Sequence, residues 1–168
     1  MKRKNKLLAL LFLILLPLTL SALAQDKGAS PTAGAKFSLS IAVAPTNAKP
    51  GEDVIVTVLL RNTSDSFYEL PVTLEALHGE RNGFIAEVTD AGGIALPRGV
   101  RPEDQRRKAE TRAIAGLNPG RTYRDKINLS KLFDLSVPGT YLVKVHRVDR
   151  QTGATVYSNV ITLTVVLQ

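Results

Sequence analysis

The segment Leu132–Val145, with the sequence LFDLSVPGTYLVKV, decides the fold of this chain. It begins with an apolar cluster, passes through a Pro-Gly turn and continues from Tyr141 as an alternation of inward and outward residues. A period of two is typical of a β-strand with one buried face. We interpret the segment as a corner, at which the chain leaves one β-sheet, closes the end of the core and enters another sheet.

The same alternation recurs on both sides of this corner. Turn residues such as Pro and Gly separate the alternating runs, and no run has the period of an amphipathic helix. A short helical turn is expected over Ser130–Leu135 with Ser130 as its cap, and a short extended element over 94–97. The sequence therefore predicts an all-β chain, a single antiparallel sandwich of seven to eight strands. The expected strands are 37–43, 53–61, 70–76, 84–88, 109–117, 123–129, 141–148 and 155–167.

The first 24 residues have the three parts of a secretory signal peptide. A basic segment at 2–6 precedes an apolar run at 7–20, and small residues end it at Ala24. The run of about 14 residues is shorter than the roughly 20 that span a bilayer. We expect cleavage near Ala24, a flexible leader over 25–35, a β-sandwich domain over 36–168 and no transmembrane segment after cleavage. The expected location is periplasmic or secreted.

Composition narrows the possible functions. Four of the 22 Lys and Arg residues lie in the signal, so the rest of the chain carries 18 basic against 15 acidic residues. That small excess does not predict nucleic-acid binding. The chain has no Cys, which excludes thiolate nucleophiles, thiolate metal sites and disulfides. It has no Trp either, which argues against a sugar-stacking surface.

Two segments share a leucine, a Pro-Gly pair and a tyrosine: Leu117–Tyr123 and Leu135–Tyr141. Both resemble the Leu…Pro-Gly…Tyr turn of fibronectin type III and related immunoglobulin-like domains, among them those of uncharacterised exported bacterial proteins. The resemblance covers roughly 37–167 and implies an immunoglobulin-like sandwich. It implies that Tyr141 buries its ring and hydrogen-bonds the upstream backbone. The corner residues that it assigns to the fold are Leu132, Phe133, Leu135, Pro138, Gly139 and Tyr141.

The chain departs from that family in lacking a core tryptophan and in carrying a long charged excursion after Gly99. The family fold serves adhesion, spacing, ligand binding and protease inhibition, so the resemblance implies no chemistry.

No stretch of the sequence has the pattern of a catalytic or metal site. The two histidines, His78 and His146, are expected at the surface, and no ligand spacing typical of zinc or copper accompanies them. No serine has a G-x-S-x-G setting. We therefore predict a protein that is not an enzyme and that uses no cofactor.

The strongest candidate for a binding site is the charged stretch 98–112. Arginine forks bind carboxylates, so this stretch could dock an acidic surface or a polysaccharide. The alternative is a solvated loop and edge strand whose charges discourage aggregation. The candidate residues are Arg98, Arg101, Arg106, Arg107, Lys108 and Arg112.

The sequence thus favours a monomeric, non-catalytic exported module that binds a protein or polysaccharide partner, or acts structurally, through its loops or a sheet edge. A protein protease inhibitor on the same scaffold is the alternative, with a loop such as 98–105 entering a protease cleft. A carbohydrate-binding module is a less favoured third possibility.

Overall fold

The computed structural model describes residues 33–73, 82–99 and 112–167 of the 168-residue chain. These residues form strands and turns, with a single 3₁₀ turn, η2 (Leu129–Lys131), among them. The prediction of an all-β chain built of antiparallel sheets is confirmed. No helix among these residues is long and apolar enough to cross a bilayer.

The first sheet has three antiparallel strands in the order β1-β3-β7. In β3, alternate residues point to the two faces. The inward ones are two buried valines and a leucine, as the sequence predicted, followed by the buried Asn62 at the end of the strand. The bounds are β1 (Phe37–Ala44), β3 (Ile55–Asn62) and β7 (Thr122–Asn128).

The second sheet has the order β2-β10-β8-β5, and β9 pairs with the far end of β8. Its centre is β8, the strand that leaves the corner. The pairing of β2 with β10 is parallel, and the other pairings are antiparallel. The bounds are β2 (Asn47–Ala48), β5 (Ile85–Asp90), β8 (Gly139–Val148), β9 (Thr155–Tyr157) and β10 (Ile161–Val165).

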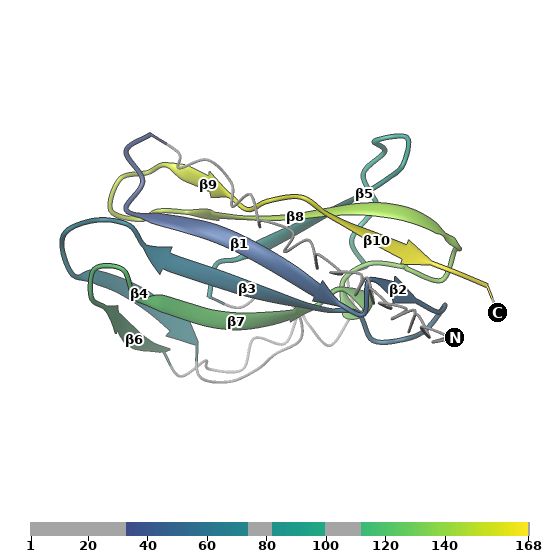
Figure 1. Ribbon diagram of the computed structural model, residues 1–168, viewed down its shortest axis with the longest axis horizontal. Helices are drawn as coiled ribbons and strands as arrows, with labels where there is room; N and C mark the ends of the chain where they lie inside the picture. The colour runs from purple at the N-terminus through teal and green to yellow at the C-terminus, as the bar shows by residue number, and fades with distance from the viewer. Residues whose placement is uncertain (1–32, 74–81, 100–111, 168) are drawn as a thin grey trace, which may run out of the picture.

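A third, two-stranded sheet pairs β4 (Tyr68–Thr73) with β6 (Arg112–Leu117). Figure 1 shows the first and second sheets as two layers, with β4 and β6 drawn below β7 in this view. The inward side of β4 joins the common core, since Tyr68 and Leu70 are almost completely buried.

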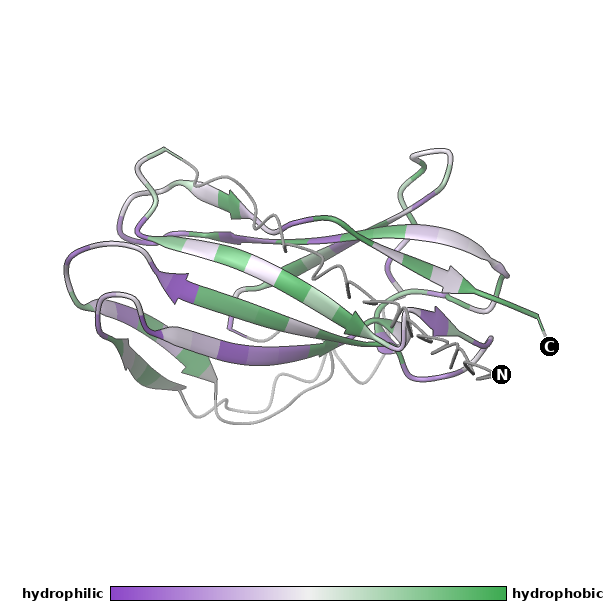
Figure 2. Cartoon of the chain, in the orientation of Figure 1, coloured by the Kyte–Doolittle hydropathy of each residue, from purple (hydrophilic) through white to green (hydrophobic). Residues whose placement is uncertain are grey.

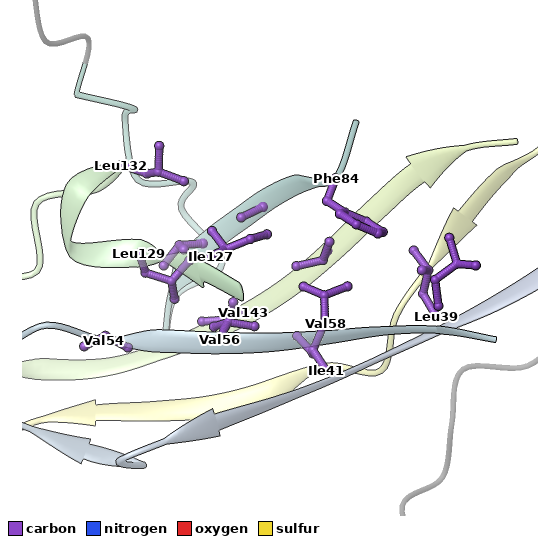
Figure 3. Close-up of a cluster of buried hydrophobic side chains, with 14 of the residues drawn as sticks. Leu39, Ile41, Val54, Val56, Val58, Phe84, Ile127, Leu129, Leu132 and Val143 are labelled. Atoms are coloured by element: carbon purple, nitrogen blue, oxygen red, sulfur yellow. The ribbon is translucent and has the colours of Figure 1, made fainter. Parts of the chain in front are cut away.

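One hydrophobic core lies between the sheets. Figure 3 shows Val56 and Val58 of β3 and Ile127 of β7 lying close to Val143 of β8 and Phe84, which precedes β5. All five side chains are at most 1% exposed. Burying a side chain of this size stabilises the fold by roughly 1.5–3 kcal/mol. With no disulfide available, this packing and the buried hydrogen bonds hold the sheets together.

The structure corrects three details of the predicted strands. The last strand is divided into β9 and β10, and Asn47–Ala48 forms a strand that was not predicted. The expected element at 94–97 is not a strand, because only Ala95 makes a bridge, to Thr89. The described residues therefore contain ten strands rather than seven or eight.

The helical turn also differs from the prediction. It covers Leu129–Lys131 rather than Ser130–Leu135, and its cap is Asn128, whose side chain accepts a hydrogen bond from the Ser130 N–H. The Ser130 hydroxyl instead donates to the Glu52 carbonyl at 2.7 Å and accepts from the Val54 N–H at 3.0 Å. Ser130 thus ties the corner to the start of β3.

Candidate functional site

The predicted corner lies where η2 leads into β8. Tyr141 is 5% exposed, and its hydroxyl donates to the Val137 carbonyl at 2.7 Å, the upstream contact that the resemblance implied. Pro138 is exposed in the turn between Val137 and Tyr141. Gly139 lies next to the Tyr141 ring, so that a Cβ added at this glycine would contact the ring. The remaining corner residues, Leu132, Phe133 and Leu135, belong to the buried core.

One residue of the predicted basic patch meets this corner. The main chain of Arg98 forms an isolated antiparallel β-bridge with that of Phe133. The guanidinium carbon of Arg98 lies 5.8 Å from the centre of the Phe133 ring. Burial lowers the pKa of Arg98. The next residue, Gly99, donates its N–H to the Leu132 carbonyl at 2.8 Å.

The rest of the predicted patch is not brought together by the described part of the chain. Arg112 is the first residue of β6. Arg101, Arg106, Arg107 and Lys108 lie outside the described residues, as does His78. The loop proposed for protease inhibition, 98–105, is described only at its first two residues.

A half-open cavity of about 440 Å³ lies beside the corner. Two carboxylates line it, Asp53 and Asp134, together with Lys131, which has a partner of its own. The Ser136 hydroxyl and main-chain N–H hold the pKa of Asp134 below its usual value. No histidine lines the cavity, and the described residues contain no group of three His, Asp or Glu side chains that could hold a metal ion.

A surface cluster surrounds the second histidine on the outer face of the second sheet. His146 Nδ1 lies 2.7 Å from one Glu87 oxygen, and Lys144 Nζ lies 2.9 Å from the other. The Tyr157 ring packs against His146, with 5.3 Å between ring centres, and Lys144 Nζ lies 5.1 Å from the Tyr157 ring centre. These side chains contact one another across three neighbouring strands, β5, β8 and β9, although His146 Nδ1 makes no hydrogen bond of good geometry.

A buried polar cluster lies behind that face, around Asp149. Its carboxylate accepts hydrogen bonds from the Lys36 N–H at 3.0 Å, the Gln151 N–H at 2.9 Å and the Tyr68 hydroxyl at 3.3 Å. Burial disfavours ionisation, but these donors outweigh it and lower the pKa of Asp149. Burial, reinforced by the charge of Asp149, raises the pKa of Tyr68 to about 12.

Arg147 completes this cluster on the inward side of β8. It is 3% exposed and lies 5.1 Å above the Phe84 ring, and burial lowers its pKa. The charge of Asp149 favours the charged form of Arg147, while Arg147 Nε and Nη1 are buried with no hydrogen-bond partner among the described residues. Sequence reasoning did not pick out this residue, although the alternation from Tyr141 places it on the inward face.

The outer face of the first sheet carries a second basic surface, which sequence reasoning missed. Arg61 of β3 and Arg124 and Lys126 of β7 are all exposed and point away from the core. In register, Leu59 stands opposite Arg124, and Arg61 lies opposite Thr122. Figure 2 shows these hydrophilic positions on β7 and at the end of β3. We call Arg61, Arg124 and Lys126 the basic face.

No acidic side chain neutralises the basic face within β1, β3 and β7. The one acidic residue of these strands, Asp125, is buried on the opposite side, where it accepts a hydrogen bond from Asn82 at 2.5 Å. The signal was present in the sequence, since Thr122, Arg124 and Lys126 alternate with Tyr123, Asp125 and Ile127. The structure adds that Arg61 joins them from another strand.

Comparisons with known proteins do not assign a family. No protein-family model matches the chain, and no curated protein matches it. Solved structures with a partial likeness include a β-glucosidase from Listeria innocua, with a TM-score of 0.44 and 14% identity, covering 81% of this chain. Another is a β-glucosidase from Erythrobacter marinus, with a TM-score of 0.40 and 12% identity over 77% of this chain.

This chain spans 17% and 16% of the length of those two glucosidase chains. At these TM-scores, neither a fold family nor an activity follows from the likeness.

Proposed function

We propose that this protein is a non-catalytic exported binding module, an immunoglobulin-like β-sandwich that binds an anionic polysaccharide through its basic face. The observation that carries the proposal is the set of exposed cations on neighbouring strands, Arg61, Arg124 and Lys126, with no acidic side chain on the outward face of β1, β3 and β7.

Strand order supports the immunoglobulin-like assignment. The first sheet, β1-β3-β7, opposes the second, β2-β10-β8-β5, and the chain alternates between them as it does in such sandwiches. The bond from the Tyr141 hydroxyl to Val137 supports it further, because a tyrosine corner is characteristic of these domains. The signal-like segment 1–24 supports export, with cleavage near Ala24.

Geometry supports an anionic, hydrophilic ligand. Successive same-face residues of a strand lie roughly 7 Å apart, so Arg124 and Lys126 form a short row of cations along β7. Arg61 adds a guanidinium, whose planar fork matches a carboxylate. None of the exposed large hydrophobic side chains belongs to β1, β3 or β7.

These properties favour a polysaccharide over a protein or a membrane. The buried centre of a protein interface is usually apolar, and a membrane-surface site usually carries apolar residues that enter the lipid. The basic face instead has hydroxyl side chains beside its cations, at Ser38, Ser40, Thr57 and Thr122, and the apolar Leu59 among them is half-buried.

The test measures binding of the purified protein, produced with its native leader, to polygalacturonate, a linear polymer of uronic acids. Neutral dextran and vesicles of phosphatidylglycerol serve as comparison ligands. We expect binding to polygalacturonate that weakens as salt is raised, because exposed charges are screened. Arg124→Glu should weaken binding roughly tenfold, a loss of about 1.4 kcal/mol.

Lys49→Glu is the matched control, because it makes the same charge change at an exposed turn outside the basic face. It should bind as the unchanged protein does. Equal losses in both variants, or binding to the vesicles but not to the polysaccharide, would show that the proposed ligand or site is wrong.

A further inference from the structure

Among the described residues, no strand pairs with the outer edge of β6. Its only pairing among the described residues is with β4, where Pro71 stands opposite Ile114. Proline has no N–H, so the hydrogen bonds of this ladder run through the neighbouring pairs, Val72–Ala113 and Leu70–Ala115. The N–H and C=O of Ile114 consequently point away from β4, as do those of Gly116 by the same alternation.

This edge is also apolar. Ile114 is 66% exposed, and Phe67, just before β4, is 55% exposed. The Phe67 ring lies against Gly116 so closely that a Cβ there would be 2.3 Å from it. Natural proteins usually protect edge strands with charge, bulges or a covering segment, because an exposed apolar edge recruits another strand.

We propose that β6 pairs in antiparallel fashion with β6 of a second copy of this chain. A two-fold axis through the middle of the strand sets Ile114 of one copy opposite Ile114 of the other. Since both residues direct their N–H and C=O outward, the pair exchanges two hydrogen bonds, as a hydrogen-bonded antiparallel pair requires. The two sheets then join into one four-stranded sheet with an isologous interface.

Charge complementarity favours a second copy as the occupant. In β4, the exposed Glu69 stands beside Gly116. Pairing centred on Ile114 brings position 112 of the partner copy opposite Gly116, and the sequence has arginine at that position. Glu69 and position 112 of the other copy are then two strand spacings apart, roughly 9.6 Å, with the Phe67 ring over Gly116 between them.

The same register places that arginine position next to the half-exposed Phe67 ring, a favourable partner for a guanidinium. A second copy thus supplies a strand, an apolar residue and a cation at matching positions. This inference is independent of the basic face, and it replaces the expectation of a monomer drawn from the sequence.

The first test is sedimentation of the purified protein across the micromolar range. We expect a monomer–dimer equilibrium in the unchanged protein and a monomer for Ile114→Pro. Because the Ile114 N–H points outward, proline there removes no bond within the protein, as Pro71 shows on the neighbouring strand. Its melting temperature, extrapolated to low concentration, should match that of the unchanged protein.

The second test examines the register. Glu69→Arg and Arg112→Glu should each raise the dimer dissociation constant several-fold, and the two together should restore it. Glu87→Arg, on the outer face of the second sheet, is the control and should leave dimerisation unchanged. A protein that stays monomeric at all concentrations, a dimer that survives Ile114→Pro, or a double variant without rescue would overturn the proposal.

Discussion

Asp149 shows how one residue joins distant parts of the chain. Its carboxylate accepts from the main chain ahead of β1, from the loop after β8 and from Tyr68 of β4. Its own N–H donates to the Ala154 carbonyl, which closes the hairpin to β9. With 0% exposure, the carboxylate depends on these donors in place of water.

Replacing Asp149 by Asn should destabilise the protein by roughly 2 kcal/mol at neutral pH, the scale of hydrogen bonds to a charged group. The folded-state pKa of Asp149 is lowered. Its contribution is therefore fully present above the unfolded value of about 3.9 and is lost as pH falls through the folded value. Urea unfolding at several pH values checks this.

The difference between the two proteins should shrink as pH falls below the unfolded value of about 3.9, because unfolding then takes up a proton, and it should vanish only below the lower folded-state pKa of Asp149. Asp65→Asn, at an exposed loop position, is the matched control and should be neutral. A stability difference that stayed constant down to acid unfolding would contradict the role given to the carboxylate.

Tyr141 allows a second test at a single atom. Tyr141→Phe keeps the buried ring but removes the hydroxyl that donates to Val137 at 2.7 Å. The expected cost is about 1 kcal/mol in urea unfolding, because one hydrogen bond of this kind is lost. Tyr157→Phe should cost nothing measurable, since Tyr157 is 44% exposed and its ring contacts remain. Equal effects of the two changes would argue against a special role for the corner tyrosine.

Among the elements, the break between β9 and β10 has a clear physical function. β8 pairs His146 with Tyr157 but Val143 with Ile161, so the broken strand contains one extra residue, a β-bulge. The bulge turns Asn159 toward the first sheet. Its carboxamide accepts from the Ile41 N–H at 2.7 Å and donates to the Ile41 carbonyl at 3.0 Å. The Asn159 side chain thus bonds the main-chain N–H and C=O of Ile41 at the edge of β1, as a neighbouring strand would.

Asn159→Ala should therefore destabilise the protein by about 2 kcal/mol or more, because two main-chain groups of the buried Ile41 lose their partner. Thermal or urea unfolding measures the change. Thr162→Ala, at an exposed position on β10, is the control and should lie within about 0.5 kcal/mol of the unchanged protein. A neutral Asn159→Ala would mean that water satisfies Ile41 equally well.

At the scale of the whole molecule, the three sheets share one core. Buried residues of β4, including Tyr68 and Leu70, belong to the same cluster as those of β1, β3 and β8. Phe37 of β1 and Tyr68 of β4 pack with 5.4 Å between their ring centres. The small sheet therefore has no separate core with which to fold independently.

This sharing predicts a single cooperative unfolding transition. Tyrosine fluorescence, which has no tryptophan to mask it, and far-UV circular dichroism should give the same midpoint in urea. Leu70→Ala in β4 should lower the free energy of unfolding by about 2–5 kcal/mol. The urea midpoints seen by the two probes should fall together. An early fluorescence transition in that variant, with unchanged circular dichroism, would show that β4 and β6 unfold on their own.

By itself, the sequence determined the all-β class, most strand positions, the inward faces and the corner around Tyr141. Those features follow from neighbours in the chain, since a period of two and a Pro-Gly turn are local. The tertiary structure alone decided the division of the last strand, the cap at Asn128, the cluster around Asp149, the basic face and the open edge of β6. All but the cap depend on residues far apart in sequence, such as Ile41 and Asn159, which are 118 positions apart. The bond of the Asn128 cap is local, but it leaves the Ser130 hydroxyl to bond Glu52 and Val54, which are distant in sequence. No local pattern states which strands become neighbours, because that choice depends on how the whole core packs.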